Sequence, residues 1–247
     1  MYRHLPIEVW RSELGLTSDE EAPRALIVHG ELSPRRAFGF ADGLLCFAHE
    51  AMHSLRIGRY KGVPIAIANV YGATLAADLT FIVVQAGAKL VVQTGWFGGL
   101  DAGQGPDAIL IPDSIASEDG VARQFRRRGP IVPSESAGLR AVIGSLGCVT
   151  GGTLVSTCSI TAETDRTVAR WAKAGRVGVD LESAATVATA QALGARAGCC
   201  LHVVDNLIRH ESFYHESVIA TAAAARRDER LRELLQRVSD YVVAEVG

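Results

Sequence analysis

Short apolar runs rich in β-branched residues alternate along the chain with longer, Ala-rich segments. This alternation is typical of the strands and crossover helices of one α/β sheet. It predicts strands at Ala25–His29, Leu55–Tyr60, Pro64–Val70, Lys89–Thr94, Ala108–Pro112, Gly152–Cys158, Gly178–Leu181 and Cys199–Asp205. It predicts helices at Ala73–Gly87, Ser136–Leu146, Ala162–Ala174, Glu182–Leu193 and His215–Val246. We therefore expect one α/β domain over residues 1–247, with an N-terminal extension of about residues 1–23.

The last predicted helix carries its apolar residues at helical spacing. Leu231, Leu234, Leu235 and Val238 recur every three or four positions among charged residues. This period places them on one face of an amphipathic helix. We expect that face to cover the sheet.

Composition narrows the class of protein. The chain has 247 residues, of which 48% are hydrophobic, enough for a large single core. Its net charge of −2 gives no overall field for a polyanion, so nucleic acid is not an expected partner. It shows neither an apolar run of the ~18 residues that a membrane span needs nor a secretion signal, which predicts a cytoplasmic protein without a membrane partner. The five cysteines lack metal-type spacing, so no metal site is expected.

The first segment with chemical potential is Val91–Leu100, a strand that runs directly into a glycine-rich turn. Gly95, Gly98 and Gly99 lie in this turn. In an open α/β sheet, ligands collect at the carboxyl ends of strands, where glycines let backbone N–H groups approach an anion or a sugar. Alternatively, these glycines only form a turn.

The second segment ends a predicted strand with two carboxylates, Asp180 and Glu182, directly before an Ala-rich helix. A carboxylate there can accept two hydrogen bonds from vicinal hydroxyls, which ribose offers. The alternative is that both acids only cap the helix and interact with its dipole.

The third segment is an apolar strand that ends in Asp205 and Asn206. Either side chain can hydrogen-bond a heterocycle and stabilise a departing base as negative charge develops on it. A simple turn is the alternative. Three polar strand ends in one chain together indicate a binding site at one edge of the sheet.

The order and spacing of these segments resemble the superfamily of purine nucleoside phosphorylases, uridine phosphorylases and methylthioadenosine/adenosylhomocysteine nucleosidases, from about Ala25 to the last helix. Thr94-Gly95-x-x-Gly98-Gly99-Leu100 looks like the Thr-Gly-Ser-Ala-Gly-Gly-Leu of the nucleosidases. Asp107–Pro112 is similar to the strand that follows it in the family. Val179-Asp180-Leu181-Glu182-Ser183-Ala184 is similar to Val-Glu-Met-Glu-Ser/Ala-Ala, the most specific of these motifs.

The resemblance implies a single-domain three-layer sandwich of the phosphorylase/hydrolase type, with helices flanking a central mixed, twisted β-sheet. It implies an enzyme that cleaves the N-glycosidic bond of a nucleoside, a small-molecule substrate, without a cofactor. The ribose-binding glutamate of the family falls on Glu182, its methionine on Leu181 and its first acid on Asp180. Family members form dimers or hexamers, so the resemblance also implies a homo-oligomer.

The base-binding position departs from the family pattern. Purine-cleaving members have Ser-Asp where this chain has Asp205-Asn206, so Asn206 takes the place of the acid. An amide can hydrogen-bond a base but cannot donate a full proton at neutral pH. Asp205 can replace it only if the strand end is re-registered.

The phosphate-binding positions depart further. Phosphorylases hold phosphate with several arginines and a hydroxyl, because an oxyanion needs charge-assisted donors. Here these positions carry Ala51, Gln93 and Trp96, and only Arg35 or Arg36, after Gly30, remain. The loss favours hydrolysis by water or a modified substrate over inorganic phosphate as co-substrate. Glu31 is the candidate for activating water, as a glutamate does in the nucleosidases.

Further candidates follow from the same resemblance. Gly30, Gln93, Thr94, Gly95 and Trp96 surround the position of the nucleophile. His4 is similar to a histidine that reaches the 5′ group in a neighbouring subunit, unless it belongs to a disordered terminus. The residues that can stack on the base are Tyr71, Phe97 and Ile160, unless they belong to the core.

Two other classes of function remain as alternatives. A catalytically impaired member of the same fold would bind a nucleoside or nucleotide without turnover. A dinucleotide-binding oxidoreductase would need Gly-x-Gly-x-x-Gly after an early strand, and the chain has no such motif there.

Overall fold

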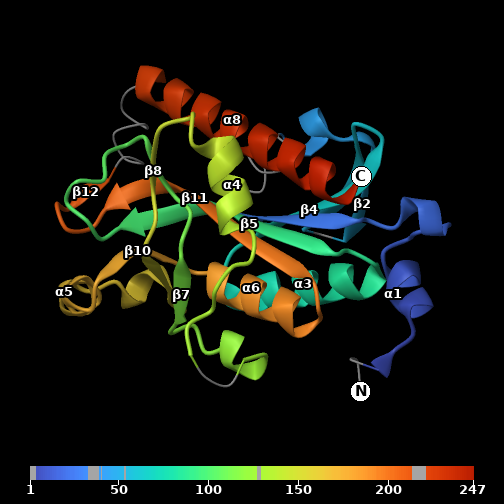
Figure 1. Cartoon of the computed structure of the whole chain (residues 1–247), viewed down its shortest axis with the longest axis horizontal. Helices are drawn as coiled ribbons and strands as arrows, with labels where there is room; N and C mark the ends of the chain where they lie inside the picture. The colour runs from blue at the N-terminus through green and yellow to red at the C-terminus, as the bar shows by residue number, and fades with distance from the viewer. Residues whose placement is uncertain (1–3, 33–38, 40, 53, 127–128, 213–220) are drawn as a thin grey trace.

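A 12-stranded mixed β-sheet between two layers of helices forms the protein (Figure 1). The computed structural model describes residues 4–32, 39, 41–52, 54–126, 129–212 and 221–247, without the side chains of Phe47 and residues 221–227. This architecture confirms the single-domain three-layer sandwich predicted from the sequence.

The centre of the sheet is parallel. Strand β5 (Leu90–Gly99) pairs in parallel with β1 (Ala25–Gly30) along one edge and with β11 (Arg196–Asn206) along the other. Strand β4 (Val63–Val70) lies in parallel beyond β1 and continues into the antiparallel strands β3 (Leu55–Tyr60) and β2 (Cys46–Met52). The inner strands are buried almost throughout, as a sheet covered on both faces requires.

The other side of the sheet divides into two branches at the carboxyl half of β5. One branch runs through β10 (Arg176–Asp180) and β9 (Thr153–Ser156) to β7 (Ser114–Ser117). The other runs from β11 to β6 (Ala108–Leu110) and β8 (Cys148–Thr150), and β12 (Glu211–Ser212) pairs with the end of β11. The division leaves the carboxyl ends of several strands around the middle of β5.

Helices cover the two faces of the sheet. α3 (Ala73–Ala86) and α6 (Ser183–Ala192) lie together on one face, and α4 (Ser136–Ile143) and α8 (Thr221–Val246) lie on the other (Figure 1). α5 (Asp165–Lys173) follows β9 and packs beside β10. Short 3-10 helices occupy Asp19–Glu21 (η2), Ala122–Gln124 (η3) and Ile160–Ala162 (η4).

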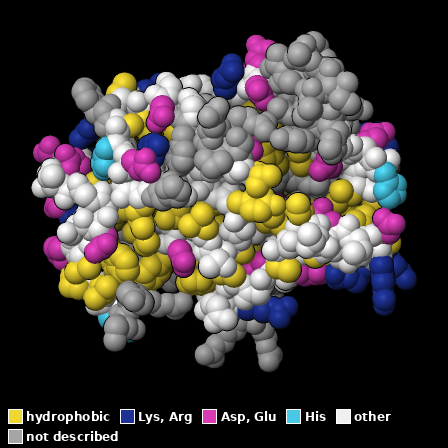
Figure 2. Space-filling model, turned by 180° about the vertical axis from the view of Figure 1, so that it is seen from behind, with side chains coloured by type: hydrophobic (Ala, Val, Ile, Leu, Met, Phe, Trp, Pro, Cys, Tyr) yellow, Lys and Arg dark blue, Asp and Glu magenta, His cyan; other side chains and the backbone are white. Residues whose placement is uncertain are grey.

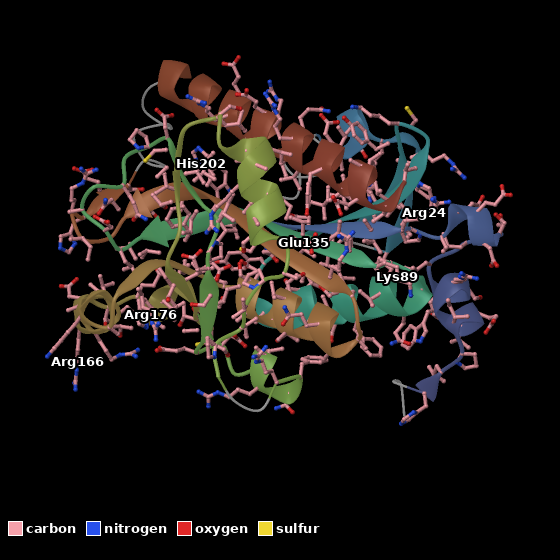
Figure 3. The ribbon with its side chains drawn as sticks, in the orientation of Figure 1. Arg24, Lys89, Glu135, Arg166, Arg176 and His202 are labelled. Carbon is pink, nitrogen blue, oxygen red and sulfur yellow. The ribbon has the colours of Figure 1, made fainter. Side chains whose placement is uncertain are left out.

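The final helix covers the sheet as its apolar pattern predicts. Leu231, Leu234, Leu235 and Val238 are buried in a core that also contains residues of β1, β4 and β5. Glu135, which precedes α4 and lies between α4 and the sheet, anchors this helix through a 2.7 Å hydrogen bond from the Tyr241 hydroxyl (Figure 3). The predicted first residues of the helix, 215–220, lie outside the described residues. Within the described chain, no helix is both long and apolar enough to cross a membrane.

The segment before β1 packs onto the domain. α1 (Ile7–Glu13) buries Trp10, whose ring meets Phe81 of α3 edge-on at 5.3 Å between centroids. The Arg11 side chain donates to the Ala86 carbonyl at the end of α3, 3.2 Å away. From residue 4 onward, the expectation of a disordered terminus is therefore wrong, because the indole and Leu14 bury apolar area in the core.

Candidate functional site

The site forms where two strands run toward each other along the same edge of β5. β1 ends with Gly30 paired to Gly95 of β5, while β10 approaches antiparallel to β5, with Val179 paired to Gly98. The chain that leaves β10 therefore runs back toward Gly95 and meets the end of β1. This geometry brings Glu182 from one strand end against Gly30 from the other.

Close backbone packing at this meeting point requires two glycines. Gly95 has a φ of +131°, and a Cβ there would lie 2.6 Å from the Gly30 carbonyl oxygen and 2.8 Å from its nitrogen. A Cβ on Gly30 would lie 2.9 Å from Oε2 of Glu182. Only residues without a Cβ fit at both positions, so the glycines do more than form a turn.

The carboxylate of Glu182 is buried at the centre of this arrangement. Its Oε1 accepts a 2.6 Å hydrogen bond from the backbone N–H of Gly72, the residue before α3, and its Oε2 lies against Gly30. Burial, and then the charge of Asp180, raise the pKa of Glu182 to about 8. The side chain makes no cap bond to helix α6. Its free lone pairs point to a ligand with hydroxyl groups.

Asp180 instead serves the fold. Its carboxylate accepts the hydroxyl of Ser156 at 2.5 Å, the backbone N–H of Ser183 at 2.9 Å and the Ser183 hydroxyl. It therefore ties β9 to the start of α6 and satisfies one of the free N–H groups there. The capping alternative describes Asp180 but not Glu182.

Glu31 and Trp96 form a second pair beside the same glycines. The indole Nε1–H of Trp96 donates to Oε2 of Glu31 at 3.0 Å, and Glu31 is buried directly after β1. The indole also meets the buried His202 edge-on, with 5.7 Å between ring centroids. The tryptophan that stands in the expected phosphate position therefore orients a carboxylate.

Gln93 and Thr94 are fully buried and bonded to their own chain. Gln93 donates to the Thr94 carbonyl at 2.7 Å and accepts the Thr186 hydroxyl at 2.6 Å. The Thr94 hydroxyl donates to the Val28 carbonyl at 3.2 Å and lies 3.1 Å from Nδ1 of His29. Burial lowers the pKa of His29 to about 4, which keeps this imidazole neutral. These residues hold β1, β5 and α6 in place around the site.

The end of β11 is re-registered in the way that a role for Asp205 requires. A bulge between Val203 and Asp205 shifts the pairing, so that Asp205 faces Gly98 of β5. Oδ1 of Asp205 is buried and accepts no hydrogen bond. An inserted residue of this kind re-aims the side chains beyond it.

Asn206, next along the chain, has its amide engaged on both sides. Nδ2 donates to the carbonyls of Asp101 and Gln104 at 3.0 and 2.9 Å, and Oδ1 accepts the N–H of Arg209 at 3.1 Å. The side chain is fully buried. Asn206 thus holds the loop after β5 against the loop after β11.

Replacing Asn206 by alanine should destabilise the protein by about 2–4 kcal/mol, because it leaves two buried carbonyls and one N–H without partners. Urea unfolding followed by circular dichroism measures the change. Asn206→Asp is the matched control: it keeps the shape and the acceptor but loses the two donors, so it should also destabilise. Unchanged stability in both variants, with loss of activity alone, would contradict this structural role.

Two further side chains join the site through electrostatic contacts. Glu163, just after the 3-10 helix Ile160–Ala162, interacts with Asp205 and Asp180, and Tyr71 interacts with Glu182 and Glu163. Burial, and then these two carboxylates, raise the pKa of Glu163 to about 7. The sequence signal for Glu163 was a carboxylate in the first loop beyond the predicted strand Gly152–Cys158, a fourth strand end that our sequence analysis missed.

The remaining candidates lie in different settings. Tyr71 and Ile160 are 46% and 57% exposed at the rim of the site, whereas Phe97 is a core residue packed over Gly178, so its proposed stacking role is wrong. Leu181 is buried. His4 is exposed just before α1, which packs at the end of α3 remote from Gly72. Arg35 and Arg36 lie outside the described residues.

Basic side chains gather away from this site. Arg24 and Lys89 precede β1 and β5, joined by a 2.9 Å bond from the Lys89 N–H to the Arg24 carbonyl. They lie at one end of the sheet, and His202, beside Trp96, lies toward the other (Figure 3). The strand ends that form the site are thus supplied with carboxylates rather than with these cations.

Solved structures with the same fold include two of uridine phosphorylase from Vibrio fischeri ES114, one of them in complex with 6-hydroxy-1-naphthoic acid. Both have a TM-score of 0.72 and 19% sequence identity to this chain. The first alignment covers 89% of this chain and 93% of the other, and the second covers 90% and 94%. No curated protein sequence matches the chain significantly.

A family model extends over the site and most of the fold. The model of the phosphorylase superfamily matches residues 30–238, from the end of β1 into α8. This range includes the glycines of β5, the carboxylates after β10 and the end of β11. The chain belongs to the phosphorylase superfamily.

Proposed function

We propose that the protein is a nucleosidase that transfers the ribosyl group of a nucleoside to water. Cleavage of the N-glycosidic bond of a nucleoside is the activity that its superfamily supports. The observation that carries the choice of mechanism is the meeting of β1 and β10. It places the buried Glu182 carboxylate against Gly30 and the Gly72 N–H, beside the pair formed by Glu31 and Trp96.

Glu182 binds the ribose. Its Oε1 is fixed by Gly72, and its remaining lone pairs accept hydrogen bonds from two vicinal hydroxyls. Ionisation of Glu182 in the complex also places negative charge beside the sugar. An oxocarbenium-like transition state carries positive charge, so this interaction strengthens as the glycosidic bond breaks.

Glu31 activates the water. The Trp96 N–H holds Oε2 of Glu31, which leaves Oε1 as the acceptor of the water proton. The water oxygen bonds to the anomeric carbon as the bond to the base breaks, and the electron pair of that bond leaves with the base. A phosphate ion in place of this water would lie beside the carboxylates of Glu31 and Glu182, and like charges at this range repel.

Asp205 is the candidate contact for the base, because the bulge turns it toward Gly98 and one of its buried oxygens has no hydrogen-bond partner. Tyr71 and Ile160 border the same side and offer apolar area for stacking. The identity of the base stays open to the substrate panel described next.

The decisive experiment incubates the purified protein with purine and pyrimidine nucleosides, in phosphate-free buffer and in excess phosphate. We expect free base and free ribose at the same rate in both buffers. Glu31→Gln should lower kcat by roughly 10²–10⁴-fold, the usual contribution of a general base. Glu8→Gln, an exposed position on α1, is the matched control and should leave kcat unchanged. Formation of ribose 1-phosphate, at a rate that rises with phosphate, would overturn the hydrolytic mechanism.

Assembly into a homo-oligomer and a cytoplasmic location stay predictions of the sequence. Hydrophobic side chains form a band across the rear face of the molecule (Figure 2). Ile7 and Val9 of α1 and Leu75 of α3 are each 37% exposed. Apolar surface of this kind supports self-association.

A further inference from the structure

We infer that Glu163 is the general acid of the reaction, delivering a proton to the departing base from the side of the site opposite Glu31. This inference rests on the proposed function and adds the residue that makes the base a good leaving group. It assigns to this chain a carboxyl donor from the loop after β9, at a position that the strand-end motifs do not contain.

The placement of Glu163 is the first part of the argument. The residue follows the 3-10 helix η4 and precedes α5, whose first turn is fixed by Thr164, which accepts the Thr167 N–H at 3.3 Å. It is partly buried and lies within electrostatic range of Asp205 on β11, Asp180 on β10 and Tyr71 after β4. Tyr71 is in turn within range of Glu182. Glu163 therefore lies on the base side of the sugar-binding carboxylate.

The second part is the charge around it. The neighbours that act on Glu163 are two carboxylates, Asp205 and Asp180, and both favour its neutral form. With burial, they raise its pKa to about 7, so a large fraction of Glu163 carries a proton at neutral pH. A carboxylic acid in this state is suited to general acid catalysis, because it holds a proton and releases it readily.

The third part is that the other side chains at the base side are less suited to donate. The Asn206 amide is committed to Asp101, Gln104 and Arg209. Burial, and then the charges of Glu182 and Glu163, raise the pKa of the Tyr71 phenol, which makes it a weaker acid. Asp205 offers a buried acceptor oxygen that can receive an N–H of the base or share the Glu163 proton.

The proton balance closes without another reactant. Water loses a proton to Glu31 as its oxygen bonds to the anomeric carbon. The carbon–nitrogen bond breaks, its electron pair stays on the base, and the base takes the proton of Glu163. Exchange with solvent then removes the proton from Glu31 and returns one to Glu163, so the products are neutral base and free ribose.

The test compares two substrates that differ in their need for acid. The first is the best nucleoside of the panel, whose base leaves as a poor anion. The second is p-nitrophenyl β-D-ribofuranoside, whose leaving group departs as a stable anion. Glu163→Gln should lower kcat on the nucleoside by roughly 10²–10⁴-fold, and should change kcat on the p-nitrophenyl riboside much less.

The pH profile supplies a second readout. If the protonated form of Glu163 is active, kcat/KM on the nucleoside falls as the pH rises through the pKa of about 7. Glu163→Gln should remove this fall and leave a flat alkaline side. Asp165→Asn, an exposed acid two residues further along, is the matched control and should retain both the rate and the pH profile.

The outcomes separate the two proposals. Equal losses on both substrates, or no loss on either, would overturn the role of Glu163 while leaving nucleoside hydrolysis in place. Absence of cleavage of any nucleoside and of the riboside by the unsubstituted protein would overturn the proposed function, and this inference with it.

Discussion

Replacing Glu182 by alanine should lower kcat/KM for the nucleoside by roughly 10²–10⁴-fold, because two hydrogen bonds to a charged group are lost and each contributes about 1.5–3 kcal/mol. The free energy of unfolding should change little. The carboxylate is buried beside Asp180, and its removal relieves desolvation and repulsion while it frees only the Gly72 N–H. Steady-state kinetics and urea unfolding measure the two effects separately.

Asp180→Asn provides the contrast. An amide NH₂ cannot accept the hydrogen bonds that Asp180 receives from Ser156 and Ser183, so this variant should be destabilised by about 2–4 kcal/mol. The prediction for Glu182 is contradicted if its alanine variant loses as much stability as Asp180→Asn, or if it retains full activity.

The raised pKa of Glu182 adds a pH dependence to this comparison. The model value of its pKa is 4.5 and the value in the folded protein is about 8, so between these the folded state binds more protons than the unfolded state. The contribution of Glu182 to stability is therefore present at low pH and is lost as the pH rises through this window. Glu182→Gln should flatten that part of the stability curve.

Replacing Gly95 by alanine should destabilise the protein by more than about 4 kcal/mol and abolish activity, since two mechanisms of destabilisation act at one position. The φ of +131° is unfavourable for an L residue, and the added Cβ would overlap the carbonyl oxygen, nitrogen and Cα of Gly30, at 2.6, 2.8 and 2.9 Å. All three are backbone atoms of β1, which cannot move without displacing Glu31. Thermal unfolding and the yield of folded protein measure the effect.

Gly98→Ala is the matched control in the same strand. A Cβ there would meet only side-chain atoms, Cδ1 of Leu207 at 3.0 Å and Cγ1 of Val179 at 3.2 Å, and these can shift. We expect a loss of about 1–3 kcal/mol, as for overpacking in a core. Equal stability of the two variants would show that the approach of β1 to β5 is looser than described.

The sequence predicted the central elements because their patterns are strong. The apolar runs of β1, β4, β5 and β11 are buried on both faces, and such runs differ clearly from the Ala-rich helices between them. β2 escaped prediction because its residues Cys46–Met52 mix polar and apolar types, and β7 and β8 are too short to show a period. α5 begins at Asp165 rather than Ala162, because Thr164 caps it.

At the site, the sequence predicted which strand ends are polar but not how each side chain is used. The motif pointed to Glu182, and the structure buries its carboxylate at the meeting of β1 and β10. The division of roles between Asp180 and Glu182, and between Asp205 and Asn206, depends on a cap and on a bulge that leave no local signal. The bond from Trp96 to Glu31 joins two strands 65 residues apart, so only the sheet register brings them together.

The division of the sheet at β5 separates two tasks that evolve under different constraints. The sugar is gripped by backbone and buried atoms of the innermost strands, Gly30, Gly95 and Glu182, where almost any exchange damages the fold. The heterocycle instead faces Tyr71 and Ile160, which are half exposed on short loops. A lineage with this scaffold can therefore change its preferred nucleobase through a few peripheral substitutions while the ribosyl chemistry is inherited intact.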